Sequence, residues 1–428
     1  MINREAALLA ATGELQQQQL QWTRELISIP TVNPYSGDTS AGLETAGQEW
    51  FAAQCRHLGG KVRIIPVPED VYARANIIGP PGRRWQGRPN VVAEWQFGTG
   101  AGPVVILNTH MDTVGTDGMT IPPFEPRVED GFIYGRGSTD SKGNLIVGLT
   151  AVAALLKHAG TLNGRVILES VVDEECNGIG AGTLACCLEG ITGDFAICLD
   201  GSAGSIHNGC NGIATPRITV HGRSGHSSLS GSVNAIDKGF AVKQAIDQFA
   251  AALRAEHPDC VFNLGMFHAG ALPSIVPSTA ELQMNINYPC AEARLSAAAG
   301  KGWNGALLRR RFEDMLAGLG GQDPWFLEKP VTVDWLKDAP PFLSPADDEM
   351  SRLAIRTVRE VAGTEVPVRP MLAWFDASHL SSVLGIPVLG VGSGTLGMSH
   401  TAGESARLDN LYRGTRSIAL TLYRLFSV

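Results

Sequence analysis

The hydrophobic pattern in the first half of the chain alternates between short apolar runs and longer segments of helical character. Residues 104–108 (VVILN), 165–172 and 195–199 are short apolar runs, which predict buried strands, whereas residues 14–28 and 141–158 are long enough for helices. Strands that alternate with helices in this way are typical of a parallel sheet covered on both faces. We therefore expect an α/β fold with a mostly parallel sheet flanked by helices.

A different pattern begins near residue 212. Residues 217–222, 260–267 and 280–288 alternate between apolar and polar side chains, as half-buried antiparallel strands do. Helical segments are predicted between and after them, over residues 235–254 and 291–316. Two helices on one face of an antiparallel sheet would form a small α+β unit.

The chain then returns to the first pattern, with a helix over residues 347–361, a strand over 386–391 and a helix over 408–426. The sequence therefore predicts a discontinuous catalytic domain that is interrupted by an inserted domain. We place the catalytic domain at residues 1–213 and 339–428, and the inserted domain at residues 214–338.

Composition excludes several classes of protein. The net charge is 34 − 42 = −8 and no run of Lys or Arg is present, which disfavours a nucleic-acid partner. No stretch approaches 18 uninterrupted apolar residues, so we expect no membrane span, and the first residues lack the apolar core of a signal peptide. Eight cysteines without a C-x-x-C pattern predict reduced thiols and a cytoplasmic location.

Acidic and imidazole side chains directly follow the predicted core strands. In an open α/β sheet, ligands bind outside the carboxyl ends of the strands, so this placement is informative. Imidazole and carboxylate groups suit a divalent cation such as Zn²⁺, Mn²⁺ or Co²⁺. The clusters contain His110 and Asp112, Asp140, the run Asp173-Glu174-Glu175, Asp200, and His400.

Local spacing suggests roles within two of these clusters. His110 and Asp112 point to the same side of an extended chain, so Asp112 can orient a ligating imidazole. Glu174 and Glu175 point in opposite directions, so one can bind metal while the other acts as a general base. Each cluster alone has an ordinary explanation: Asp140 can stabilise a helix start, and Asp200 can cap a turn.

Several motifs together resemble the metallo-amidohydrolase family of acetylornithine deacetylase, succinyl-diaminopimelate desuccinylase, aminoacylase and carboxypeptidase G. The G-R-G-[ST]-x-D-x-K-G segment is the most specific, and the resemblance spans nearly the whole chain. The matching segments are NTHMDTV at 108–114, YGRGSTDSKG at 134–143, VDEE at 172–175, GHSS at 225–228, NAI at 234–236, FDA at 375–377, and His400-Thr401 with Glu404.

The resemblance implies a site for one or two divalent ions that activates water for hydrolysis of a C–N bond in a small molecule. It implies that Glu174 is the general base, that Asp112 orients His110, and that a cis peptide bond follows Asp140. The ligands would be His110, Asp140, Glu175, Asp200 and His400, with Asp140 shared between two ions. One ion rather than two remains an alternative, because Asp200 stands where deacylases often carry the longer Glu.

The inserted domain resembles the family's ferredoxin-like dimerisation lid, which implies a homodimer or a higher oligomer. In that family the lid histidine, here His226, reaches across the dimer to stabilise the oxyanion. The alternative is that His226 is a turn residue with local hydrogen bonds only.

The chain departs from the family pattern in the lid. The family's Arg, which grips a substrate carboxylate, is replaced by Asn287 in the triplet Asn285-Ile286-Asn287, and Asn cannot form the same bidentate clamp. Asn287 is therefore our candidate substrate-binding residue. The departure also keeps open a hydrolytic deaminase that acts on a ureide or an aromatic amine.

An NAD-binding oxidoreductase is a distant alternative. Residues 392–397 fit the G-x-G-x-x-G pattern of NAD-binding loops, although the following residues do not look like a helix start. No G-x-S-x-G elbow of a serine hydrolase is present in the sequence. A binding protein on a decayed enzyme fold is disfavoured, because every matched ligand and the base are chemically competent.

Overall fold

The computed structural model describes residues 4–38, 43–158, 162–228, 230–345 and 347–427. Its larger sheet has seven strands in the order β1-β2-β6-β3-β7-β17-β8. The four central strands β6, β3, β7 and β17 are parallel to one another, while β1, β2 and β8 pair antiparallel at the margins. The strands are β1 (Lys61–Ile65), β2 (Asn90–Phe97), β3 (Val104–His110), β6 (Gly164–Val171), β7 (Phe195–Cys198), β8 (Ile206–His207) and β17 (Val388–Val391).

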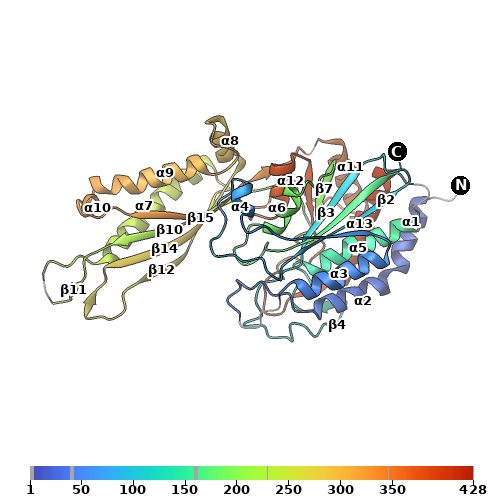
Figure 1. Cartoon of the computed structure of the whole chain (residues 1–428), viewed down its shortest axis with the longest axis horizontal. Helices are drawn as coiled ribbons and strands as arrows, with labels where there is room; N and C mark the ends of the chain where they lie inside the picture. Colours follow the sequence, from blue (N-terminus) through green and yellow to red (C-terminus); the bar gives the residue numbers. More distant parts are fainter. Residues whose placement is uncertain (1–3, 39–42, 159–161, 229, 346, 428) are drawn as a thin grey trace.

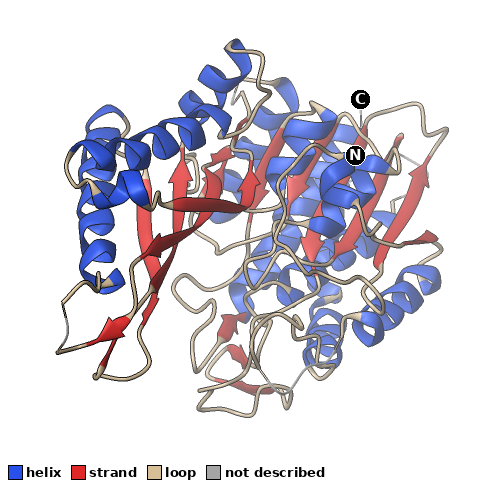
Figure 2. Cartoon of the chain, turned by 60° about the vertical axis from the view of Figure 1, so that its left-hand side comes forward, coloured by secondary structure: helices blue, strands red, loops and turns tan. Residues whose placement is uncertain are grey.

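Helices cover both faces of this sheet (Figure 2). Alternate residues of β3 show why: Val105 and Leu107 pack into one apolar cluster, and Val104 and Ile106 pack into another on the opposite face. The first cluster contains side chains of α1 (Arg4–Glu14), α2 (Gln16–Ile27), α3 (Thr45–His57), α5 (Lys142–Leu156), α11 (Glu349–Ala362) and α13 (Leu408–Phe426). The second contains α6 (Ala181–Leu188) and α12 (Ala377–Leu384). The predicted α/β architecture with a mostly parallel core is confirmed.

A second sheet of four antiparallel strands extends away from the first (Figure 1). Its order is β12-β14-β10-β15, and its strands are β10 (Gly212–His221), β12 (Val261–Ala269), β14 (Thr279–Tyr288) and β15 (Thr332–Ala339). α7 (Ala235–Glu256) and α9 (Ala306–Ala317) pack on one face of this sheet, where Ile218, Leu282 and Phe312 share an apolar core. The other face carries polar side chains such as Thr215, Gln283 and Asn285, which are half-buried.

The chain enters and leaves this second sheet at neighbouring positions. β10 and β15 pair with each other, and Ile213 lies opposite Ala339. Just outside the sheet, β9 (Gly209–Cys210) pairs with β16 (Phe342–Leu343). The two crossings between the sheets therefore lie side by side.

The single helix predicted over residues 291–316 is wrong. The structure has α8 (Cys290–Ala298) and then α9, separated by a loop in which Gly300 and Gly302 have φ values of 71° and 86°. Glycine adopts this left-handed conformation without a steric penalty, and such a residue ends a helix.

The remaining elements are short. They are α4 (Val71–Arg74), α10 (Trp325–Glu328), the 3-10 helix η2 (Gly318–Gly321), β4 (Arg127–Glu129), β5 (Phe132–Tyr134), β18 (Ser405–Arg407), β11 (Gly225–His226) and β13 (Ile275–Val276). No helix in the described part of the chain combines the length and hydropathy needed to cross a bilayer.

Candidate metal centre and active site

The parallel strands of the larger sheet end beside one another, and the candidate ligands lie where they end. His110 is the last residue of β3, Glu175 follows β6, Asp200 follows β7, and His400 lies in the loop after β17. Asp140 lies in the turn before α5. The expected cis peptide bond is present between Asp140 and Ser141.

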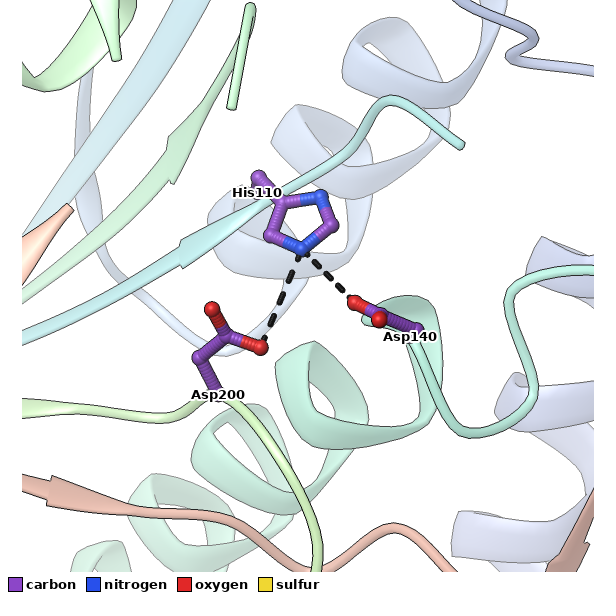
Figure 3. Close-up of side chains that lie close together, drawn as sticks. All are labelled: His110, Asp140 and Asp200. Atoms are coloured by element: carbon purple, nitrogen blue, oxygen red, sulfur yellow. Dashed lines mark hydrogen bonds and ion pairs between the residues drawn. The ribbon is translucent and has the colours of Figure 1, made fainter. Parts of the chain in front are cut away.

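One group of three side chains forms around His110 (Figure 3). Its Nε2 lies 3.0 Å from Oδ1 of Asp140 and 3.9 Å from Oδ1 of Asp200. His110 and Asp200 are buried, and Asp140 is half-buried. One nitrogen and two oxygen donors thus converge on a single point.

A second group forms around His400 and shares Asp140 with the first. Nε2 of His400 lies 3.0 Å from Oε1 of Glu175 and 3.4 Å from Oδ2 of Asp140. In each group the three donor atoms lie within 4.8 Å of one another. The two oxygens of Asp140 therefore face different histidines, which is the arrangement that a shared carboxylate requires.

The donor chemistry fits divalent cations. Burial and the nearby carboxylate of Asp140 raise the pKa of Glu175 to about 7 and the pKa of Asp200 to about 6. Within the described residues, the ion pairs of these three carboxylates are formed only with His110 and His400, not with Lys or Arg. A bound cation would supply the positive charge that the three crowded carboxylates lack.

The turn that carries Asp140 is fixed by Glu404. Oε1 of Glu404 accepts hydrogen bonds from the main-chain N–H groups of Thr139 and Asp140 at 3.0 and 3.1 Å. Its other oxygen accepts from Arg136 at 2.6 Å. The motif residues Arg136 and Glu404 therefore fix the main chain at Asp140 and leave its carboxylate to face the histidines.

Asp112 contacts His110 differently from the prediction. Nδ1 of His110 lies 2.9 Å from the main-chain oxygen of Asp112 and 3.7 Å from its carboxylate. The carboxylate instead accepts from the side chain of Asn33 at 2.7 Å and from the main-chain N–H of Glu175 at 3.2 Å. Asp112 thus connects the His110 strand to the loop of Glu175, and Asn33 is a contributor that the sequence analysis missed.

The loop of Glu174 and Glu175 is anchored through Asp173. This residue has a φ of 72°, and its carboxylate accepts hydrogen bonds from Arg83 at 3.1 Å, Arg88 at 3.1 Å and Tyr72 at 2.9 Å. Arg88 also pairs with the buried Glu44 at 2.7 Å. These partners were missed as well, because no local pattern marks them.

Glu174 lies beside the two groups without belonging to either. Burial and the neighbouring carboxylates of Asp200 and Glu175 hold its pKa well above the usual range, although His110 acts in the opposite direction. A carboxyl group with a raised pKa next to a cation site is suited to accept and return a proton.

Comparison with known proteins identifies the family of the chain. The sequence pattern of Peptidase family M20/M25/M40 matches residues 106–424. The chain belongs to this family. With its candidate metal ligands, this family member is a metal-dependent hydrolase of carbon–nitrogen bonds.

Individual relatives cover the chain almost completely. It is 26% identical over 454 residues to the N-formyl-4-amino-5-aminomethyl-2-methylpyrimidine deformylase of Halalkalibacterium halodurans, covering 97% of this chain and 96% of that protein. The dipeptidase Dug1p of Saccharomyces cerevisiae has a similar structure, with a TM-score of 0.72 at 15% identity and 99% of both chains covered. The YXEP protein of Bacillus subtilis, described as a dinuclear metal-binding peptidase, has a TM-score of 0.62 at 15% identity, with coverage of 97% of this chain and 99% of that chain. Both structural likenesses show a shared fold.

Two candidate residues of this M20 protein lie apart from the metal ligands. His226 is exposed on β11, at the far end of the second sheet (Figure 1), and its Nδ1 lies 2.8 Å from Oγ of Ser228. Asn287 donates a hydrogen bond to the main-chain oxygen of Leu372 at 3.3 Å. Neither belongs to the two donor groups around His110 and His400 that the described residues form.

The glycine-rich segment 392–397 does not lead into a helix. It follows β17 and runs into the loop of His400, and α13 begins only at Leu408. A dinucleotide-binding loop needs a helix N-terminus at this point, so the segment lacks the required context.

Proposed function

We propose that this chain releases a small acyl group from an N-acylated amine, and that N-formyl-4-amino-5-aminomethyl-2-methylpyrimidine is its first substrate to test. The observation that carries the proposal is the pair of donor groups that share Asp140, with Glu174 beside them. The choice of substrate is supported by the match to the H. halodurans deformylase along nearly the whole of both chains.

Two sets of ligands are proposed for two divalent ions. His110, Asp140 and Asp200 would hold one ion, and Asp140, Glu175 and His400 would hold the other. Nitrogen and carboxylate donors of this kind suit Zn²⁺, Mn²⁺ or Co²⁺. When bound, such ions polarise a carbonyl group and lower the pKa of water.

The chain's own residues then handle the protons. Glu174 would accept a proton from the water that attacks the acyl carbon, and would return it to the amine nitrogen as the C–N bond breaks. Asp112 would hold two parts of the site in position: its main-chain oxygen contacts His110, and its carboxylate accepts a hydrogen bond from the Glu175 loop. Asn287 is proposed to contact the substrate at the position where the family has Arg.

We further propose that residues 214–338 form a lid domain between the two parts of the catalytic domain, residues 1–213 and 339–428. The four-stranded sheet supports this division, because its first strand along the chain is β10 and its last is β15. A cytoplasmic location is supported by eight cysteines that are all free thiols.

The substrate proposal predicts hydrolysis that depends on added metal. Protein stripped by a chelator and reconstituted with Zn²⁺, Mn²⁺ or Co²⁺ should cleave the formylated pyrimidine with a kcat of about 1–10³ s⁻¹, the usual range for enzymes. Released amine is measured, with an N-succinyl amino acid and a dipeptide as comparison substrates. If the protein cleaves none of the three amides with any of the three metals, the proposal is contradicted.

A homodimer is proposed, in which His226 of each subunit serves the active site of the other. The exposed position of His226, far from the ligands of its own chain, supports this arrangement. The edge strand β12 also leaves Val261 exposed, which suits pairing with a second copy.

Mixed dimers test the role of His226. Glu174→Gln and His226→Ala chains are each expected to be nearly inactive, but a heterodimer would contain one site with both groups intact. Equal mixing should therefore restore about a quarter of the activity of the unsubstituted protein, because half of the dimers are mixed and each has one intact site. Activity that stays at the level of the separate variants would contradict the shared site.

A further inference from the structure

A cavity of about 330 Å³ lies between the polar face of the second sheet and the loops beside the metal ligands. Lys337 of β15 and Asn285 of β14 line it from the sheet. Pro80, Pro81 and Asn177 line it from the larger body of the chain.

Lys337 is the unusual residue of the cavity wall. Only 4% of its surface is exposed, and its Nζ donates a single hydrogen bond, to Oδ1 of Asn177 at 3.3 Å. It forms no ion pair within the part of the chain that the structure describes, and burial lowers its pKa to about 8. A buried ammonium group with donor capacity to spare is costly unless a ligand supplies further acceptors.

The amide side chains of the wall offer both donors and acceptors. Oδ1 of Asn285 accepts from Oγ1 of Thr215 at 2.6 Å, which leaves its NH₂ group available as a donor. The NH₂ group of Gln283 donates to Glu281 at 2.9 Å, which leaves its carbonyl oxygen available as an acceptor. A cavity wall that offers both a donor and an acceptor matches the edge of a ring that also carries a donor and an acceptor. Amide side chains match the N6/N7 edge of adenine in the same way. A carboxylate offers acceptors only and would leave the acceptor of Gln283 unused.

Apolar surfaces in the same cavity suit a flat ring. Pro80 and Pro81 contribute from one side of the junction, and Met266 contributes from β12. Thioether sulfur and proline rings both pack well against an aromatic face.

The cavity adjoins the loop that carries out the proposed chemistry. Asn177, the partner of Lys337, is two residues beyond Glu175 in the loop after β6. The main-chain oxygen of Cys176 in that loop accepts a hydrogen bond from Arg83 at 2.6 Å. The charge of Glu174 also acts on the ammonium group of Lys337, so these two side chains are near each other. We therefore expect a ligand ring beside Lys337 and Asn177 to bring a short side arm within reach of Glu174.

We propose that this cavity binds the heterocycle of the substrate, with Lys337 as the donor to a ring nitrogen and Gln283 and Asn285 as partners of the exocyclic amine edge. The inference rests on the proposed function and names its specificity-determining residue. The ligand class is a nitrogen heterocycle that carries both a ring-nitrogen acceptor and an amino donor.

The test compares two formamides that share the reacting group. N-formyl-4-amino-5-aminomethyl-2-methylpyrimidine carries the ring nitrogens, and N-benzylformamide carries a phenyl ring instead. In the metal-loaded protein, Lys337→Met should lower kcat/KM for the pyrimidine roughly 10–100-fold, mainly through KM, because it removes a hydrogen bond from a charged donor. The value for N-benzylformamide should change less than about 3-fold.

Two variants complete the comparison. Asn285→Asp keeps the oxygen that accepts from Thr215 but loses the NH₂ donor. It should therefore also lower kcat/KM for the pyrimidine more than for N-benzylformamide. Arg294→Met is the matched control, because it removes a cation from a different cavity of about 730 Å³ and should leave the ratio of the two substrates unchanged. Melting temperatures of all variants show whether folding is preserved.

The outcomes separate the inference from the proposed function. Equal losses for both formamides in Lys337→Met, or a selective loss in Arg294→Met instead, would overturn the heterocycle site while leaving the amidase activity in place. If neither formamide is cleaved, binding of both is measured on metal-loaded Glu174→Gln. Tighter binding of the pyrimidine that depends on Lys337 would then support the cavity and refute the hydrolysis, whereas no preference for the pyrimidine would overturn the inference.

Discussion

Replacing Glu174 by Gln is expected to lower kcat by roughly 10²–10⁴-fold, the usual contribution of a general acid–base group. Gln has the same shape but cannot accept a proton from water or return one to the leaving amine. Because Glu174 belongs to neither donor group, bound metal should be retained. Steady-state kinetics and elemental analysis of the same preparation measure both effects.

The neighbouring residue provides the control for this prediction. Glu175→Gln changes the adjacent carboxylate in the same way, but Glu175 lies 3.0 Å from His400 in the second donor group. That variant should lose metal, whereas Glu174→Gln should not. Nearly normal turnover of Glu174→Gln with metal in place would show that another group transfers the proton.

Part of the candidate metal centre could be predicted from apolar runs, because three of its five candidate ligands lie at or just beyond the end of such a run. His110, Glu175 and Asp200 come just after strands that are parallel in the structure, and parallel strands bring their carboxyl ends to the same edge of a sheet. The position of these residues just after apolar runs was therefore enough to predict that they lie close together.

The support of the catalytic loop could not be predicted in this way. Arg83 and Arg88 lie 90 and 85 positions before Asp173, and nothing in their local sequence marks them as its partners. Asn33 likewise contacts Asp112 from 79 positions away. Such contacts depend on how the first loops fold over the sheet, which periodicity does not encode.

Lys337 was missed for a related reason. It lies in β15, a strand that the sequence analysis did not identify, and its surroundings come from two parts of the chain. Register decides that its side chain is buried beside Asn177, since a shift of one position would place Leu336 or Asp338 there instead. The proposed specificity site thus lies where the second sheet meets the larger one, and no local sequence pattern marks it.

Asp140→Ala is expected to remove metal binding altogether, with a loss of activity at least as large as that of Glu174→Gln. The two carboxylate oxygens of Asp140 face His110 at 3.0 Å and His400 at 3.4 Å, so this substitution leaves each group with only two donors. Stabilisation by metal should vanish as well; it amounts to about 2.7 kcal/mol when free metal is 100-fold above Kd. Elemental analysis and melting temperatures with and without Zn²⁺ measure the two losses.

Asp200→Ala separates a shared ligand from an ordinary one. Among the described residues, Asp200 belongs to the His110 donor group and not to the His400 group, so its loss should weaken one ion and leave the Glu175–His400 group able to bind the other. Metal content should therefore fall to about one ion per chain in Asp200→Ala and to nearly none in Asp140→Ala. Equal metal contents in the two variants would mean that Asp140 does not bridge, because the difference between them depends only on whether one carboxylate serves both ions.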